Sequence, residues 1–196
     1  MPVSVALYEK SLRTIGPRLD ALGLDIEIVP FNADGQFLVN GATVLPSEVE
    51  IDYLWLSPEI SADKIHKQAF GLAVDCKSIG VLQTFNAGLD HPAYKKISDK
   101  GVCICNSSAQ ATGIAEYVMA HVLDVFHPMA RRRELQASKT WETTPFREIS
   151  RSNWLIFGFG PIGQGVAMRA KAFGATTTVV RRSRSWVESR SSTKRQ

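Results

Sequence analysis

Residues 153–184 read NWLIFGFGPIGQGVAMRAKAFGATTTVVRRSR, and this stretch decides the fold. It begins with a short apolar run, passes through the glycine pattern GFGPIG at 158–163, and then becomes helix-like up to Gly174. A second run, rich in β-branched residues, follows at 176–180 and ends in two arginines. The order strand, glycine turn, helix, strand is typical of the unit that binds dinucleotides.

Each glycine of this pattern has its own expected role. Gly158 allows a tight turn off the strand, and Gly160 lets the backbone approach a pyrophosphate because no Cβ intervenes. Gly163 lets the helix pack close to the strand, and the helix N-terminus offers unpaired N–H groups to the phosphates. The alternative is a glycine-rich turn that binds nothing. The predicted phosphate-binding residues are Gly158, Gly160, Pro161, Ile162 and Gly163.

The end of the second strand favours one of the two nicotinamide cofactors. A site for NAD normally has an acidic residue there, which takes the ribose hydroxyls. This chain instead has Arg181 and Arg182, and no acidic residue occurs between Gly163 and Glu188. Guanidinium groups pair with a phosphate, whereas a carboxylate repels it. We therefore favour NADP over NAD, with arginines that merely solvate a strand end as the alternative.

Composition bounds the class of protein. The 196 residues are 44% hydrophobic and 21% charged, which is ordinary for a globular protein. No apolar run is long enough to span a membrane, and the N-terminus MPVSVALYEK lacks a signal-peptide pattern. These features predict a cytoplasmic protein without a membrane partner. Cys76, Cys103 and Cys105 lack metal-ligand spacing, so we expect buried, reduced thiols and no metal site.

The net charge of +4 is concentrated near the C-terminus, a distribution that can indicate nucleic-acid binding. We favour a cofactor phosphate site followed by a solvated tail, because aromatic platforms and recognised nucleic-acid motifs are absent from the sequence. We therefore expect no nucleic-acid partner.

Before residue 153, short apolar runs alternate with amphipathic segments, which indicates a parallel sheet covered by helices. A long apolar stripe then predicts a helix over 111–134, which Pro128 kinks or ends. The segment 138–152 is polar and predicts a surface loop. Strands are expected over 3–7, 24–29, 51–56, 79–85 and 102–105, and helices over 11–22, 62–72 and 91–100.

These pieces together resemble the D-isomer-specific 2-hydroxyacid dehydrogenase family. The matching segments span most of the chain, and Arg181 to Arg184 is similar to the NADPH-using glyoxylate/hydroxypyruvate reductase branch. The segments are FNAGLDH at 85–91, GVCICN at 101–106, IAE at 114–116 and GFGPIG at 158–163.

The resemblance implies an α/β protein with two domains. A flavodoxin-like substrate domain over 1–105 precedes an incomplete Rossmann NAD(P)-binding domain over 106–185, and a disordered basic tail follows over 186–196. It also implies that the backbone amides of Ala87 and Gly88 hold the carboxylate of a small 2-oxo or 2-hydroxy acid. The alternative for these two residues is an ordinary turn after a strand.

The same resemblance implies an Arg, a Glu and a His that catalyse the reaction beyond the second Rossmann strand. This chain ends before them, so we expect a C-terminally truncated form without catalytic residues, through a frameshift, a splice form or a genuine product. The leading hypothesis is a dehydrogenase-like protein that is inactive in this form. One alternative is a non-catalytic NAD(P)-binding or dimer-partner module, a homodimer forming through the cofactor domain and its helix 111–134. Another is a fragment in which only the first domain folds.

Overall fold

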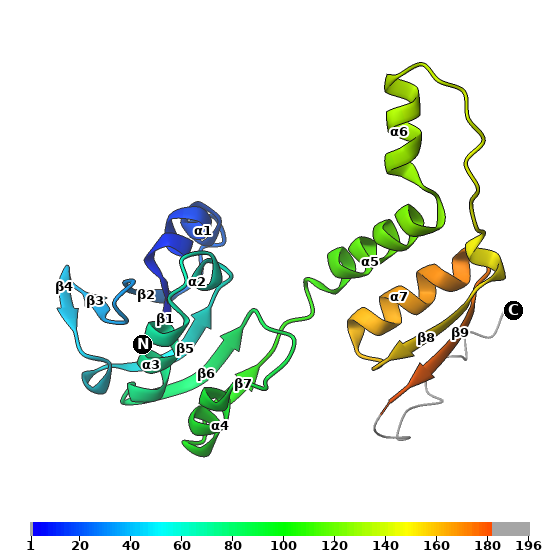
Figure 1. Cartoon of the computed structure of the whole chain (residues 1–196). Helices are drawn as coiled ribbons and strands as arrows, with labels where there is room; N and C mark the ends of the chain where they lie inside the picture. Colours follow the sequence, from blue (N-terminus) through cyan, green and yellow to red (C-terminus); the bar gives the residue numbers. More distant parts are fainter. Residues whose placement is uncertain (1, 182–196) are drawn as a thin grey trace, which may run out of the picture. The chain divides into compact units, whose positions relative to one another are not determined.

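The computed structural model describes residues 2–181 and divides the chain into two compact units, Met1–Ser108 and Ala109–Gln196 (Figure 1). Both units mix helices with strands that are mostly parallel. The expected tail 186–196 lies outside the described residues.

Unit 1 is built on a seven-stranded sheet with the order β4-β3-β2-β1-β5-β6-β7. Its five parallel strands, β2-β1-β5-β6-β7, follow the flavodoxin-like order 2-1-3-4-5. The strands are β1 (Val3–Tyr8), β2 (Ile26–Phe31), β3 (Phe37–Val39), β4 (Ala42–Val44), β5 (Glu50–Leu56), β6 (Ser78–Thr84) and β7 (Cys103–Cys105). The helices are α1 (Glu9–Ala21), η1 (Pro46–Glu48), α2 (Glu59–Ala62), α3 (His66–Asp75) and α4 (Pro92–Asp99).

The antiparallel hairpin β3–β4 extends this sheet beyond β2. Its turn is made by Asn40 and Gly41, whose φ angles of 51° and 81° are both in the left-handed region. Such a pair is the strongest short-range hairpin signal in a sequence. The signal was visible, but strands of three residues are too short for hydrophobic alternation to reveal them.

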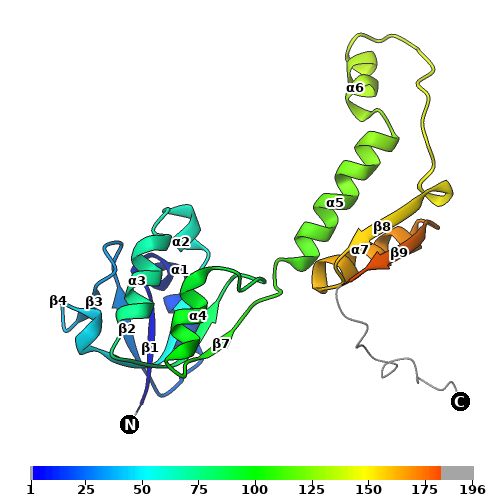
Figure 2. The ribbon, with the colours of Figure 1, turned by 60° about the horizontal axis from the view of Figure 1, so that its bottom comes forward.

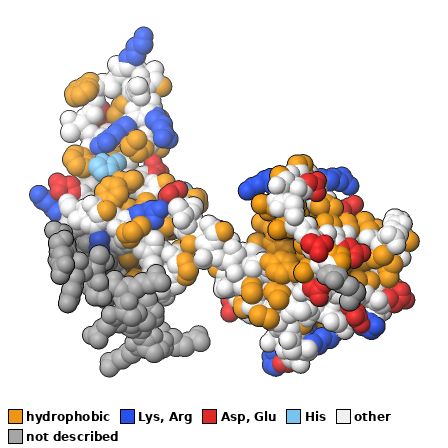
Figure 3. Space-filling model, turned by 180° about the vertical axis from the view of Figure 1, so that it is seen from behind, with side chains coloured by type: hydrophobic (Ala, Val, Ile, Leu, Met, Phe, Trp, Pro, Cys, Tyr) orange, Lys and Arg blue, Asp and Glu red, His pale blue; other side chains and the backbone are white. Residues whose placement is uncertain are grey.

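The main core cluster of unit 1 joins the sheet to helices α2, α3 and α4. Leu54 and Leu82 are fully buried there, and helices α2, α3 and α4 contribute further buried side chains. The preceding residues, Tyr53 and Val81, point to the opposite face and are only half-buried. Hydrophobic side chains also gather on the surface of unit 1 in the view of Figure 3.

The described part of unit 2 contains a parallel pair of strands and three α-helices, of which α5 packs against α7. The predicted helix 111–134 is divided in two, because α5 ends just before Pro128 and α6 begins after it. The elements are α5 (Ala111–Phe126), α6 (Met129–Ala137), η2 (Ile149–Arg151), β8 (Asn153–Phe157), α7 (Pro161–Ala172) and β9 (Thr176–Val180).

One face of the β8–β9 pair is exposed. Leu155, Phe157 and Val180 have exposed fractions of 56%, 78% and 44%, and Phe157 pairs directly with Val180. Helix α7 packs on the strands with Val166 and Ala170 buried. Parallel strands are normally covered on both faces, so the described part of unit 2 is an incomplete layer set.

Two expectations about the chain's environment can be compared with the structure. No helix in the described residues is long and apolar enough to cross a membrane. The cysteine prediction was partly wrong: all three thiols are free, but only Cys76 is buried. Cys103 and Cys105 lie on β7, a three-residue strand at the edge of the sheet, and Cys103 is exposed there.

Candidate functional site

The glycine turn of unit 2 joins β8 to α7 through a residue in the left-handed region. Gly158 has φ +87°, and its N–H donates to the carbonyl of Val180 on β9 at 2.7 Å. A Cβ at Gly163 would lie 2.4 Å from the carbonyl oxygen of Gly158, so only glycine fits there. At Gly160, the residue that caps α7, no atom lies within 4 Å of the Cβ position. The turn is therefore tight at its two ends and open in the middle.

The open middle of this turn presents main-chain donors. Pro161 has no N–H, and the N–H groups of Gly160, Ile162 and Gly163 have no protein acceptor among the described residues. The carbonyl of Phe159 is already taken by the Gln164 side chain, at 2.9 Å. Free N–H groups at the start of a twelve-residue helix form a favourable position for a phosphate.

The two arginines follow the end of β9. Phe157 and Val180 are the last paired residues of the two strands, so the exposed Arg181 follows β9 at the sheet edge where Gly158 follows β8. Arg182 lies outside the described residues. The structure thus brings Arg181 to the same end of the sheet as the glycine turn.

In unit 1, the segment that contains Ala87 and Gly88 follows β6 at the carboxyl edge of the parallel sheet. The carbonyls of this segment are held from the end of β7. Ser107 donates its N–H to the carbonyl of Asn86 at 3.0 Å, and the Asn106 side chain donates to the carbonyl of Ala87 at 2.8 Å. Both peptide oxygens are therefore turned towards the residues that follow β7.

The amides of the same segment are open. In a trans peptide the N–H points away from the C=O, and no peptide bond of the described chain is cis. The N–H groups of Ala87 and Gly88 accordingly point away from the β7 end, and neither has a protein acceptor among the described residues. Adjacent free N–H groups are a feature of anion-binding concavities. We call residues 86–88 the carboxylate loop, after the ligand that the resemblance implies for them.

Two features restrict anion binding at this loop. Gly88 is exposed, and a Cβ there would lie 3.0 Å from a carboxylate oxygen of Asp90, which places a negative charge close by. On the other side, the Asn86 N–H donates to Thr84 and its side-chain amide donates to the hydroxyl of Tyr94. Sequence analysis did not assign a role to Thr84, Tyr94 or Asn106. A polar residue ending an apolar strand was the available signal for Thr84.

The usual ligand position of this sheet order is filled by the protein itself. Strand order reverses between β1 and β5, and a ligand normally lies beyond their carboxyl ends. There Ser11 and Ser57 are fully buried with their hydroxyl oxygens 2.5 Å apart, and Ser11 also bonds to Glu59 at 3.0 Å. Burial acts to raise the pKa of Glu59, but hydrogen bonds from its backbone, Ser57 and Ser11, with Lys10 nearby, lower it overall. The carboxylate loop lies beyond the next strand, β6.

The four histidines all make structural contacts. His66 bonds to Ser61 at 2.9 Å, and the His91 ring stacks on Phe70 while its Nδ1 accepts from the Ala93 N–H. The other two histidines contact aromatic rings in unit 2, His121 with Tyr117 and His127 with Phe146. Among the described residues, no group of three or more His, Cys, Asp or Glu side chains is arranged to hold a metal ion.

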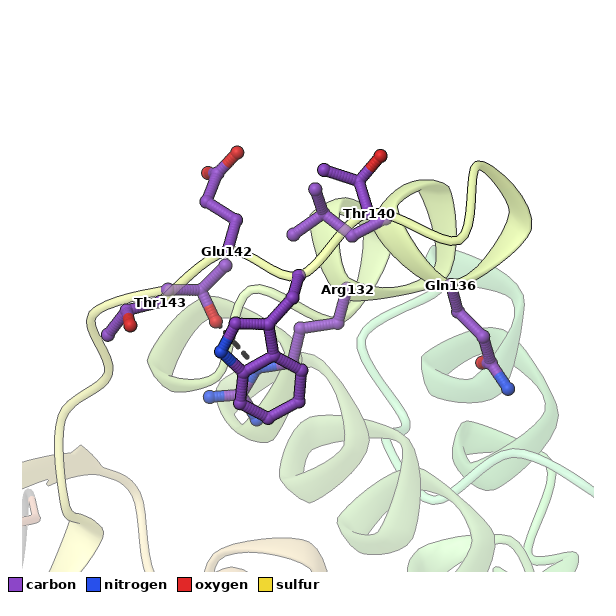
Figure 4. Close-up of a pocket in the computed structure, with 8 residues that line it drawn as sticks. Arg132, Gln136, Thr140, Glu142 and Thr143 are labelled. Carbon is purple, nitrogen blue, oxygen red and sulfur yellow. Dashed lines mark hydrogen bonds between the residues drawn. The ribbon is translucent and has the colours of Figure 1, made fainter.

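A cavity of about 510 Å³ lies elsewhere in unit 2, between α6 and the segment that follows it (Figure 4). We call residues 129–148 the arm, because they project from the layer of α7, β8 and β9 (Figures 1 and 2). Arg132 donates to Thr144 at 2.9 Å, and Trp141 is 97% exposed. The cavity is lined by Arg132, Leu135, Gln136, Thr140, Trp141, Glu142, Thr143 and Thr144.

Comparison with known proteins gives a family-model match in unit 2 and a curated relative that matches half of the chain. Residues 119–195 fit the model of the D-isomer specific 2-hydroxyacid dehydrogenase NAD binding domain. A hydroxypyruvate reductase of Thermotoga maritima is 32% identical over 101 residues, which are 50% of this chain and 33% of that protein. This chain thus matches about a third of the length of that curated relative.

Solved structures share the fold along most of this chain. An NADPH-dependent glyoxylate/hydroxypyruvate reductase of Sinorhizobium meliloti superposes with a TM-score of 0.60 and 17% identity, covering 96% of this chain and 56% of that one. A D-lactate dehydrogenase of Aquifex aeolicus, complexed with NAD and lactic acid, gives 0.54 and 17%, covering 90% and 50%. The chain is thus similar to the D-isomer specific 2-hydroxyacid dehydrogenase family: residues 119–195 match the NAD binding domain of that family, and the fold is shared with these solved structures along most of the chain.

Proposed function

We propose that this chain carries two binding loops of an NAD(P)-dependent 2-hydroxyacid dehydrogenase. The carboxylate loop binds the substrate, and the glycine turn at 158–163 binds the phosphates of the cofactor. The reaction is a hydride transfer between nicotinamide and a small 2-oxo or 2-hydroxy acid such as glyoxylate or hydroxypyruvate. The proposal rests on the two open N–H groups of Ala87 and Gly88. The carbonyl groups of the same two peptides already accept hydrogen bonds from the residues that follow β7. A nicotinamide cofactor, when bound, supplies the redox chemistry, and the protein supplies binding and orientation.

The two loops would bind the two anionic ends of the reactants. The amides of the carboxylate loop donate to the carboxylate of the acid, which fixes the orientation of its neighbouring carbon. The open N–H groups at Gly160, Ile162 and Gly163 donate to the cofactor phosphates. Gly158 has a steric role, because it makes the turn that brings α7 back onto the strand.

No histidine among the described residues is arranged for proton transfer. Each histidine is engaged in a contact of its own unit, and none is paired with a carboxylate that would tune it as a base. We therefore propose that the 196-residue chain binds cofactor and acid without appreciable turnover.

For the cofactor, we propose NADP in preference to NAD. Arg181 follows β9 beside the glycine turn, where the ribose of a dinucleotide normally meets an acidic residue. A guanidinium there favours a 2′-phosphate through charge-assisted hydrogen bonds. Arg182 is the second proposed contact, on the basis of the sequence alone.

Binding and turnover of the purified 196-residue chain test these proposals separately. NADPH and NADH binding is followed by cofactor fluorescence, and turnover by cofactor absorbance with glyoxylate or hydroxypyruvate. We expect NADPH to bind about tenfold more tightly than NADH and Arg181→Glu to remove the preference. Equal affinities would overturn the NADP proposal, and turnover well above background would overturn the proposal of an inactive chain. If neither NADPH nor NADH binds, the proposal that the glycine turn binds the cofactor phosphates is wrong.

A second candidate function is a dimer-partner module. It is favoured by a stripe of exposed apolar side chains on α5, in which Tyr117 and Val125 have exposed fractions of 65% and 70%. The exposed Trp141 of the arm adds a large aromatic side chain of the kind enriched at protein interfaces. We propose that a second copy of this chain covers this surface.

Sedimentation analysis of the chain and of the Tyr117→Arg variant tests the dimer. A dimer in the parent chain that dissociates in the variant is expected. A parent chain that stays monomeric at high micromolar concentration would contradict the proposal.

A further inference from the structure

The carboxylate loop is tied to α4 by a closed ring of hydrogen bonds. The hydroxyl oxygens of Thr84 and Tyr94 lie 2.7 Å apart, and the side-chain amide of Asn86 donates to the Tyr94 hydroxyl at 2.9 Å. The backbone N–H of Asn86 donates to the Thr84 hydroxyl at 3.2 Å, which closes the ring. Thr84 and Tyr94 have exposed fractions of 0% and 3%, so the ring is shielded from water.

The Tyr94 hydroxyl contributes two of the three bonds in this ring. Its ring is packed edge-on to Phe70, with centroids 5.1 Å apart, and it is held in α4. The position of the hydroxyl is therefore set by packing that is independent of the loop. Without it, the Asn86 amide would lose its bond to Tyr94 and Thr84 would lose a buried partner, both at a cost in free energy.

Asn86 immediately precedes the two open amides. Its side chain and N–H are held by the ring, and its carbonyl is held by Ser107. With all three groups fixed, the peptide between Asn86 and Ala87 has one orientation, and its N–H points to the open side of the loop. The ring and the Ser107 bond together determine the direction of the first amide of the proposed anion site.

We propose that Tyr94 is the positioning residue of the carboxylate loop. It does not touch the substrate. It acts through Asn86, which it holds in the orientation that aims the Ala87 and Gly88 amides at the carboxylate. This inference rests on the proposed function of the loop as an anion site, and it adds a residue outside the loop that sets the affinity of the loop for a carboxylate.

The test compares Tyr94→Phe with the parent in the full 196-residue chain, with glyoxylate as the probe. The variant keeps the aromatic packing and removes only the hydroxyl. Amide NMR follows the resonances of Ala87 and Gly88 during titration and gives the Kd, while circular dichroism gives the thermal midpoint. We expect the Kd for glyoxylate to rise about tenfold in Tyr94→Phe, because a pre-organised pair of donors is lost.

Three further variants separate positioning from general stability. Thr84→Ser retains the hydroxyl and should keep the parent affinity, whereas Thr84→Val removes it and should weaken binding as Tyr94→Phe does. Lys95→Gln breaks an ion pair with Asp99 in the same helix and should leave glyoxylate affinity unchanged. If Tyr94→Phe fails to fold, the comparison of Thr84→Ser with Thr84→Val decides the question.

Failure of the inference and failure of the proposed function give different results. Parent-like affinity in both Tyr94→Phe and Thr84→Val would overturn the positioning role while leaving the anion site intact. If the parent binds no glyoxylate, the anion site itself fails, and hydrogen exchange of the Asn86 amide then tests the ring. Faster exchange in Tyr94→Phe and Thr84→Val than in Thr84→Ser supports positioning by the ring, and equal rates overturn it.

Discussion

The two loops that we propose to bind anions are built by opposite means. In unit 2, the turn at 158–163 takes its shape from glycine: one has φ +87°, and another leaves no room for a Cβ. In unit 1, the carboxylate loop takes its shape from side chains of neighbouring elements, chiefly Thr84, Tyr94 and Asn106. The first loop is determined by its own sequence, and the second by the packing of residues elsewhere in the unit.

This difference predicts where each loop is vulnerable. A glycine turn fails when a side chain is added at one of its tight positions, because backbone atoms must move. A loop held by side chains fails when a hydroxyl or an amide is removed at a distance from the ligand. Substitutions of the two kinds should therefore damage one unit and spare the other.

The largest effect is expected for Gly163→Ala, because the new Cβ would lie 2.4 Å from the Gly158 carbonyl oxygen. We expect a loss of about 3 kcal/mol in the stability of unit 2 and loss of NADPH binding. Urea unfolding followed by tryptophan fluorescence measures the first, and cofactor fluorescence the second. Gly160→Ala is the matched control, since no atom lies within 4 Å of its Cβ position. Equal stability of the two variants would contradict the steric explanation.

A smaller effect is expected for Asn106→Ala in unit 1. The substitution removes the bond to the Ala87 carbonyl, which is worth about 1 kcal/mol, and lets that peptide turn. Glyoxylate affinity, measured by amide NMR, should fall about fivefold while NADPH binding is unchanged. A matching loss of NADPH affinity would show that the two loops are not independent.

Acid should weaken unit 1 through Glu59. Its pKa is lower in the folded protein than its usual value, so the carboxylate stabilises the fold above that value and loses this contribution as pH falls through the folded pKa. Glu59→Gln cannot titrate and should show less loss of thermal midpoint between about pH 6 and about pH 3. Glu27→Gln, which removes an exposed carboxylate on β2, is the control. An acid response that is unchanged in Glu59→Gln would refute this role.

The smallest effect is expected for Asp90→Asn. The Asp90 carboxylate lies close to Gly88 and opposes an approaching anion, although water screens the exposed charge. Removing it should tighten glyoxylate binding about twofold at low salt. The gain should disappear at high ionic strength, and a gain that persists in salt would indicate a change in loop shape instead.

Much of the fold could be predicted from the sequence, because its signals are local. The apolar strands of unit 1 and the strand–turn–helix–strand order at 153–180 were both visible as patterns. Asn40 and Gly41 indicated a hairpin or a loop in the turn-rich segment 31–46, but the strands β3 and β4 themselves were not predicted, since three residues are too few for a periodic pattern. Proline marked the break in the long helix at 128, but whether it would bend the helix or end it depends on packing that no local signal encodes.

The candidate site, like the fold, was predictable only where its signals are local. The glycine turn was readable because left-handed and space-limited positions select glycine directly. The roles of Thr84 and Tyr94 were not, because their hydroxyls meet only after β6 and α4 have packed together. Asn106 was part of a recognised segment, yet its bond to Ala87 spans 19 residues and depends on the register of β6 and β7. The role proposed for each loop remains a prediction until binding is measured.

The main-chain character of the carboxylate loop has a consequence for mutational scanning. Its two donors are peptide N–H groups, so replacing the Ala87 side chain deletes neither of them. A scan for binding would therefore show little at the point of contact. It would respond instead at positions remote from the ligand, where a hydroxyl or an amide fixes the peptide planes. The sensitive positions would be the residues that support the loop, and the residues that contact the ligand would show little effect.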